Sequence, residues 1–152
     1  MQAIKNLHEP AILQEILQRF DKLKPDAQRA WGKMDVSQML AHCANALENT
    51  LGDKKIKQSF LGKILGGFAK KSITNDQPFK QGLPTDSRFV VADSRNFETE
   101  KQRLIPLIKR LSATDPEKLA AVPHSFFGKM DAKEWNALNY KHLDHHLRQF
   151  GA

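Results

Sequence analysis

Residues 131–151 read DAKEWNALNYKHLDHHLRQFG and carry the clearest helix signals in the chain. Asp131 is followed three residues later by Glu134, a pattern in which each side chain accepts a hydrogen bond from the other residue's backbone N–H at a helix start. Gly151 supplies the end, because glycine readily takes the left-handed conformation found after helices. An apolar stripe at helical spacing lies between them, made by Leu143, Leu147 and Phe150. The sequence therefore predicts a long final helix.

Four earlier segments also have helical patterns. Residues 10–23 and 35–52 place apolar side chains at helical spacing, and the second begins with a capping pair of its own, Asp35 and Gln38. Residues 97–111 do the same, although a proline inside this segment must kink the helix or be compensated by its neighbours. A shorter helix is expected over 60–71, weakened by two consecutive glycines.

The remaining segments read as connections. Residues 72–93 contain Pro78, Gly82 and Pro84 with little periodicity, and loops of this length are often functional. A weak strand pattern is confined to residues 89–92, and Pro116 and Pro123 bound a further loop. The predicted fold is therefore all-α: a four-helix bundle with a short extra helix and a long connection between its second and third main helices.

Composition favours one globular domain spanning residues 1–152. Hydrophobic residues make up 40% and charged residues 27% of the 152 residues, which is ordinary for a globular protein. No apolar stretch approaches the ~20 residues that span a bilayer, and residues 1–10 have no apolar leader core, so we expect a cytoplasmic protein. The single cysteine, Cys43, excludes a multi-cysteine zinc motif, and any metal must be held by nitrogen and oxygen.

The chain is basic, with a net charge of +7 and a pI of about 9.6. An anionic small molecule, nucleic acid or an anionic membrane are partners that such a charge can attract. Six lysines gather in one region: Lys54, Lys55, Lys57, Lys63, Lys70 and Lys71. A solvated helix face is the plainer interpretation of such a cluster.

Histidines form the strongest chemical pattern. His142 and His146 are four residues apart on the final predicted helix, so their side chains project side by side, with about 6 Å between Cβ atoms. His42 lies at the margin of the core-facing side of the second predicted helix. Packing these margins together would bring three imidazoles toward one point. Three nitrogen ligands with a fourth position open are typical of catalytic zinc sites and are also accepted by nickel, cobalt or iron.

Other residues near these histidines have plainer alternatives. His145 is one step off the ligand face, and we expect it behind the ligands or exposed. Cys43 points about 100° away from His42 on the helix, which favours a buried packing role over a nucleophile. The remaining candidates for supporting the ligands or lining a pocket are Trp135, Asn139, Gln149 and Asn45. A core position is the plainer interpretation for the tryptophan.

Several motifs can be compared with known families: Trp31, SQMLAHC at 37–43, HSFFGK at 124–129, Glu134-Trp135 and YKHLDHHLRQFG at 140–151. Together they resemble a bacterial family of unknown function within the DinB/YfiT-like superfamily, over nearly the whole chain. The resemblance implies a four-helix bundle whose members are regarded as metalloenzymes. One ligand lies on the second helix and an HxxxH pair on the last.

The closing motif of related DinB proteins reads roughly H-G-T-H-H-R-G-Q. Residues 142–149, HLDHHLRQ, overlay it without a gap. The resemblance thus places His142 and His146 at the paired ligand positions and His42 at the second-helix position. Leu147-Arg148 stands where the motif has Arg-Gly, a departure from the superfamily. Members with assigned activities include thiol-dependent transferases and a maleylpyruvate isomerase.

Three possibilities stay open from the sequence, the third being a helical bundle that keeps its histidines without turnover. The first is a metal-dependent enzyme in which a divalent ion, zinc or nickel, activates water or a small thiol for hydrolysis or group transfer on a small molecule, anionic or thiol-bearing. The second is a non-catalytic binding module that presents its basic surface to nucleic acid or an anionic membrane. Nucleic acid is disfavoured because few aromatic residues are interleaved with the charges. A homodimer also stays open.

Overall fold

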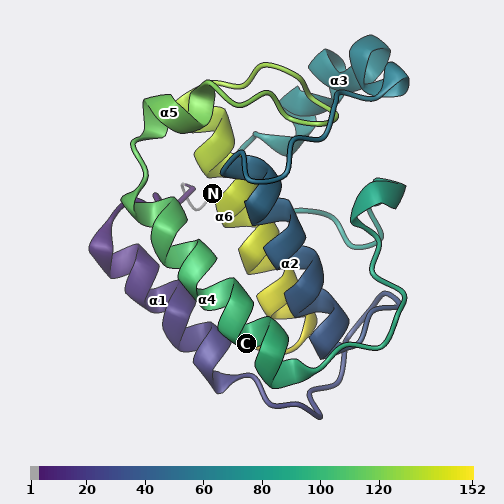
Figure 1. Cartoon of the computed structure of the whole chain (residues 1–152), viewed down its shortest axis with the longest axis vertical. Coiled ribbons are helices and arrows are strands. Elements are labelled where there is room, and N and C mark those ends of the chain that lie inside the picture. The colour runs from purple at the N-terminus through teal and green to yellow at the C-terminus, as the bar shows by residue number, and fades with distance from the viewer. Residues whose placement is uncertain (1–3) are drawn as a thin grey trace.

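Four of the five longer helices lie side by side in the computed structural model, which describes residues 4–152 (Figure 1). They are α1 (Pro10–Lys22), α2 (Val36–Thr50), α4 (Phe97–Ala113) and α6 (Ala132–Gln149). α2 packs against α4 and α6, and α1 packs against the same two helices. The other elements are α3 (Phe60–Ile73), the short α5 (Pro116–Ala120) and a 3₁₀ turn, η1 (Ser87–Phe89). The prediction of an all-helical fold is confirmed, since no strand forms within the described residues.

The helix starts follow from local side-chain chemistry. Asp35 and Asp131 accept hydrogen bonds from the backbone N–H groups of Gln38 and Glu134, and the side chains of Gln38 and Glu134 accept in return. Both capping pairs predicted from the sequence are therefore confirmed. Each satisfies N–H groups that have no partner within the helix, which is worth about 1 kcal/mol per cap.

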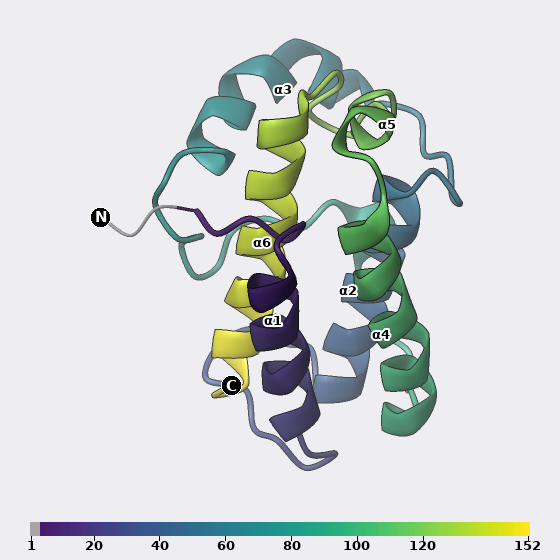
Figure 2. The same cartoon turned by 90° about the vertical axis from the view of Figure 1, so that its left-hand side faces the viewer.

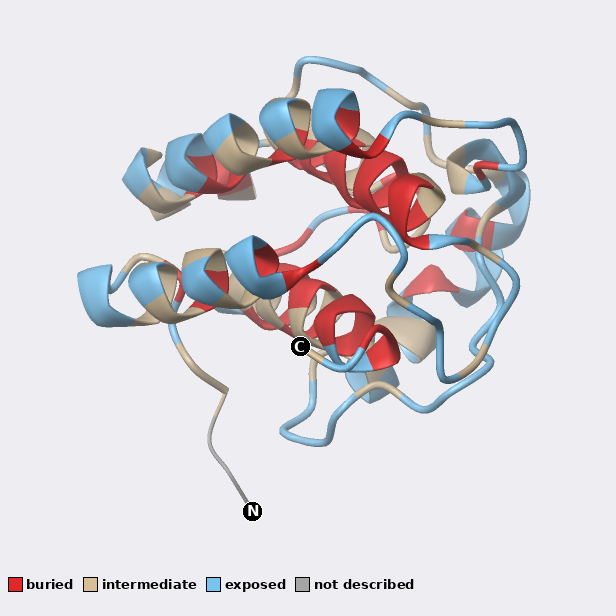
Figure 3. Cartoon of the chain, turned by 90° about the horizontal axis from the view of Figure 1, so that it is seen from below, coloured by how far each residue is buried: buried red, intermediate tan, exposed pale blue. Residues whose placement is uncertain are grey.

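The core is formed by the sides of the four long helices that face one another, as the buried ribbon segments in Figure 3 show. Burial of one such large apolar side chain contributes roughly 1.5–3 kcal/mol. The largest fully buried side chains include Phe20, Met39, Leu40, Leu47, Leu104, Ile108, Trp135 and Leu143. This packing fixes α2 and α6, which carry the histidines, against each other.

Two local predictions are wrong. The weak strand pattern over residues 89–92 forms no strand; the chain instead makes the 3₁₀ turn η1, started by Asp86, whose carboxylate accepts from the Arg88 N–H. The expected loop between Pro116 and Pro123 contains α5. Proline suits the first helical turn because its missing N–H would have no partner there. By contrast, α4 continues through Pro106.

α3 lies across one end of the four long helices (Figure 2). Its two buried glycines, Gly62 and Gly66, face the backbone of the loop at Phe126, and a Cβ atom on either would come within 2.4 Å of the Phe126 carbonyl oxygen. At its other end, the Lys141 ammonium of α6 donates to the carbonyl oxygens of Ile73 and Asn75. Within residues 4–152 no helix is long and apolar enough to cross a membrane.

Candidate metal centre

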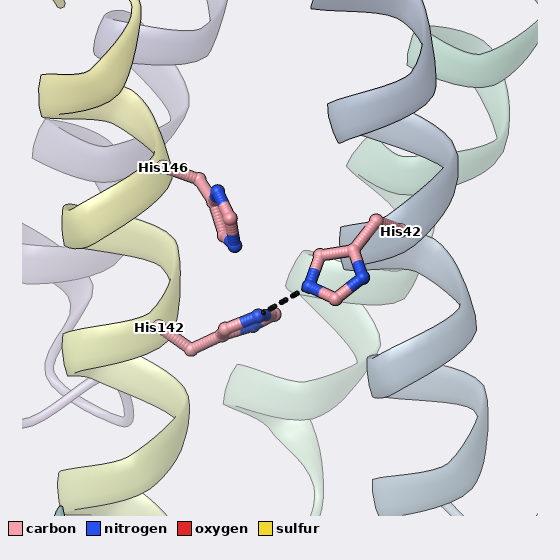
Figure 4. Close-up of side chains that lie close together, drawn as sticks. All are labelled: His42, His142 and His146. Carbon is pink, nitrogen blue, oxygen red and sulfur yellow. Dashed lines mark hydrogen bonds between the residues drawn. The ribbon is translucent and has the colours of Figure 1, made fainter. Parts of the chain in front are cut away.

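Three histidine rings from two helices converge in the interior. His42 comes from α2, and His142 and His146 come from successive turns of α6 (Figure 4). One ring nitrogen from each lies within 4.8 Å of the others. The Nε2 atoms of His42 and His142 are 2.8 Å apart. No other group of three His, Cys, Asp or Glu side chains within residues 4–152 brings its ligand atoms this close.

Hydrogen bonds on the far side of two rings fix their orientation. The Nδ1 of His42 lies 2.8 Å from the carbonyl oxygen of Phe89, and the Nδ1 of His146 lies 2.8 Å from Oε1 of Gln149. Gln149 is held in turn, because its Nε2 donates to the Trp31 carbonyl oxygen. A neutral imidazole that donates Nδ1–H to a carbonyl keeps its lone pair on Nε2. Both rings therefore offer Nε2 as a ligand atom.

Burial keeps these rings in the neutral form that binds metals. His42 and His146 are buried and His142 is half-buried. Burial lowers the pKa of His42, against the opposing hydrogen bond to Phe89, and lowers the pKa of His146 to about 3. Burial, and secondarily the neighbouring histidines, hold the pKa of His142 well below its usual value. Near neutral pH, metal binding therefore requires no net release of protons from these rings.

The donor set fits a divalent transition metal. Two nitrogens on one tetrahedral zinc ion, each bonded at ~2.0–2.1 Å, lie about 3.3 Å apart. The observed nitrogens range from 2.8 Å to at most 4.8 Å apart, so changes of up to about 1.5 Å in these separations bring them to this spacing. Imidazole suits zinc and nickel, and no thiolate takes part. His42, His142 and His146 together can hold a metal ion.

The cluster opens onto a cavity of about 790 Å³. α3 and the segment from Phe79 to Phe89 supply further parts of its lining, so the long connection predicted over 72–93 contributes to the site. Its lining is largely apolar and includes Leu61, Ile73, Leu83, Phe126 and Leu138. A small organic molecule fits a cavity of this size.

The other residues predicted near the site divide into two groups. His145 and Asn139 line the cavity, and Gln149 holds His146. Trp135 lies two turns from His142 along α6 and is buried in the core, where its Nε1 donates to the Val122 carbonyl. Asn45 is turned toward α4, where Arg103 donates to its Oδ1. Neither of these two residues lines the cavity.

Two features of the site were not predicted from the sequence. The Phe89 carbonyl that orients His42 is a backbone group, which residue identity does not reveal. Thr50 lies on α2 two turns beyond His42; it lines the cavity and donates to Oδ1 of Asn139. A helical wheel could have found Thr50, because residues seven or eight apart share a helix face.

Cys43 takes no part in the cluster. It is fully buried in the core, where its Sγ lies 3.7 Å from the Met39 sulfur. Burial raises the pKa of its thiol well above the usual value. This agrees with the packing role predicted from its direction on the helix, since the thiolate is the reactive form.

His124 lines the cavity, and its titration is expected to lower the stability of the fold in acid. Its Nδ1 accepts from the N–H groups of Phe126 and Phe127, and burial lowers its pKa from 6.5 to about 4. Because His124 is harder to protonate in the folded state than in the unfolded state, its protonation favours unfolding. Its contribution to the free energy of unfolding is therefore fully present above pH 6.5 and is lost as the pH falls toward 4. By pH 4.5, His124 alone is expected to remove about 2 kcal/mol from the free energy of unfolding.

Urea unfolding of His124→Asn measures this contribution. An asparagine oxygen can accept the same two N–H groups but does not titrate. With a chelator present to exclude metal effects, the variant is expected to lose about 2 kcal/mol less than the wild type between pH 7 and 4.5. Equal losses in the two proteins would show that His124 does not titrate as described.

Comparisons with known proteins give one match. No curated protein and no solved structure matches the chain. The family described as "Protein of unknown function (DUF1569)" matches residues 1–152, and thus includes both histidine-bearing helices and the connection between them. The chain therefore belongs to the DUF1569 family.

Proposed function

We propose that this protein is a metal-dependent enzyme in which His42, His142 and His146 hold a divalent ion, zinc or nickel. The observation that carries the proposal is the meeting of three imidazoles at a cavity, two of them with Nδ1 bonded to a carbonyl oxygen. The motif resemblance supports a further part of the proposal, that the four long helices are a bundle of the DinB/YfiT-like type. One ligand on α2 and two on α6 agree with that pattern.

A divalent ion on three histidines supplies a Lewis acid that acidifies water or a small thiol, for hydrolysis or group transfer. The protein's own groups prepare the site. Phe89 and Gln149 aim two of the rings, and the low pKa values keep all three rings neutral. The apolar cavity lining limits water, which strengthens electrostatic interactions inside.

The cavity lining favours a thiol or an uncharged substrate with an apolar body. Among the described residues, Arg88 is the one arginine or lysine that lines the cavity. Its guanidinium already bonds both carboxylate oxygens of Asp86, at 2.5–3.2 Å. Binding an anion there would compete with an existing ion pair, so we place an anionic substrate second.

Chelation and reloading test the proposal. Untagged protein is treated with a chelator, dialysed, and titrated with Zn²⁺ or Ni²⁺ by calorimetry. Each form is then assayed with 4-nitrophenyl acetate for hydrolysis and with glutathione and an aryl chloride for thiol transfer. We expect about one ion per chain, and activity that returns on reloading in the wild type but not in His42→Ala/His146→Ala. A titration without binding would contradict the metal site, whereas binding without turnover would contradict only the enzyme.

Gln149 gives a finer prediction about metal affinity. Replacing it by leucine keeps the size of the side chain but removes the acceptor for His146 Nδ1. Loss of such a support typically weakens metal binding 10–100-fold, and we expect a change of that order in the Zn²⁺ dissociation constant. Asn45→Ala is the control, because this polar residue of α2 bonds Arg103 away from the cavity. Equal affinities of Gln149→Leu and wild type would contradict the orienting role.

A further inference from the structure

The outward side of α3 is apolar. Its large side chains are mostly exposed: Phe60 by 79%, Leu61 by 57%, Ile64 by 62%, Leu65 by 46% and Phe68 by 85%. On a helical wheel they lie within about 140° of one another. The opposite side carries Gly62 and Gly66, which pack against the loop at Phe126. α3 therefore turns its small residues inward and its large apolar residues mostly toward solvent, although Leu61 also lines the cavity.

The same region is strongly basic. Residues 54–75 contain six lysines and no acidic residue, in a chain whose net charge is +7. Lys54 and Lys70 form ion pairs with Glu48 and Glu134. The other four have no ion pair within the part of the chain that the structure describes: Lys55, Lys57, Lys63 and Lys71. All four are exposed.

A second copy of the chain fits this surface poorly. In a two-fold dimer the same patch meets itself, so lysines that no acid neutralises would approach one another. Nucleic acid would use the lysines but leave the aliphatic members of the patch, Leu61, Ile64 and Leu65, without a role.

We propose that α3 docks onto the surface of an anionic phospholipid bilayer. Such a surface binds both the exposed apolar side chains and the lysines, since interfacial helices place Phe and Leu at the acyl boundary while lysines contact acidic headgroups. The position of α3 suits this, because it lies across one end of the molecule with the four long helices on its inner side (Figure 2). The lysines that precede the helix, Lys55 and Lys57, extend the basic surface.

Vesicle sedimentation tests the docking. The full chain is mixed with phosphatidylcholine vesicles, with or without 30% phosphatidylglycerol. We expect at least tenfold stronger binding to the anionic vesicles, weakening as salt is raised. Phe60→Ser/Phe68→Ser is expected to reduce binding at least tenfold. Lys63→Gln/Lys71→Gln should reduce it by about fivefold per lysine.

Matched variants separate docking from general effects of charge or hydrophobicity. Lys109→Gln/Lys118→Gln removes the same charge from exposed positions on α4 and α5, and Val90→Ser removes an exposed apolar side chain outside α3. These variants should bind vesicles like the wild type, and circular dichroism should show that every variant is folded. Three results would overturn the proposal. They are no binding to anionic vesicles, vesicle binding that persists in Phe60→Ser/Phe68→Ser, or a dimer that these two substitutions dissociate. DNA binding that is lost in Lys63→Gln/Lys71→Gln but kept in Phe60→Ser/Phe68→Ser would assign the surface to nucleic acid instead.

Discussion

The His142→Ala variant is expected to bind Zn²⁺ on the order of 1,000-fold more weakly than the wild type. Two protein nitrogens would remain, on different helices, and water would have to replace the third. His142 bridges the two helices, with 2.8 Å between its Nε2 and that of His42. Its removal breaks the cluster at the point where the two helices meet.

Thermal unfolding gives a second measure of the same variant. At a Zn²⁺ concentration 100 times the dissociation constant, binding stabilises the folded state by about 2.7 kcal/mol. For a chain of this size, that corresponds to a rise in Tm of roughly 5–10 °C. We expect the rise in the wild type and none in His142→Ala. His145→Ala is the control, since His145 lies beside the cluster but is not among its three rings. Equal rises in all three proteins would place the ion elsewhere.

Trp135→Ala is expected to lower the free energy of unfolding by about 3–5 kcal/mol, the usual cost of deleting a buried aromatic side chain. The indole is 1% exposed, donates to Val122 and lies 5.4 Å from the His124 ring between centroids. It thus joins the first turn of α6 to the loop ahead of it. The loss combines a cavity in the core with a carbonyl left unpaired.

Urea unfolding with Trp135→Phe as a second variant measures this effect. Phenylalanine keeps most of the volume and loses only the donor, so a smaller loss, about 1–2 kcal/mol, is expected. A loss below about 1 kcal/mol in Trp135→Ala would contradict the core position of the indole.

The elements with strong local signals were predictable. α2 and α6 each begin with a capping pair whose hydrogen bonds depend on two residues three positions apart, and this is visible in sequence. The meeting of the three histidines also followed from helical spacing, because His142 and His146 lie one turn apart and His42 lies at the margin of α2. Their role as metal ligands stays a prediction.

Features that depend on tertiary contacts were not predictable. Trp135 shares a helix face with His142, but its position nearly two turns away puts it in the core. Asn45 accepts a hydrogen bond from Arg103 of α4, which is 58 residues away in the sequence, and does not line the cavity. The apolar residues of α3 suited core packing equally well, and only the packing of Gly62 and Gly66 against the loop decides that they face outward.

Anomalous diffraction from crystals of untagged protein, grown with Zn²⁺ or Ni²⁺ and measured on both sides of the metal absorption edge, tests the metal site most directly. We predict one strong anomalous peak per chain, about 2.0–2.1 Å from the Nε2 atoms of His42, His142 and His146, and absent below the edge. No peak between α2 and α6, or a peak held by other residues, would contradict the assignment of these three histidines as the metal ligands.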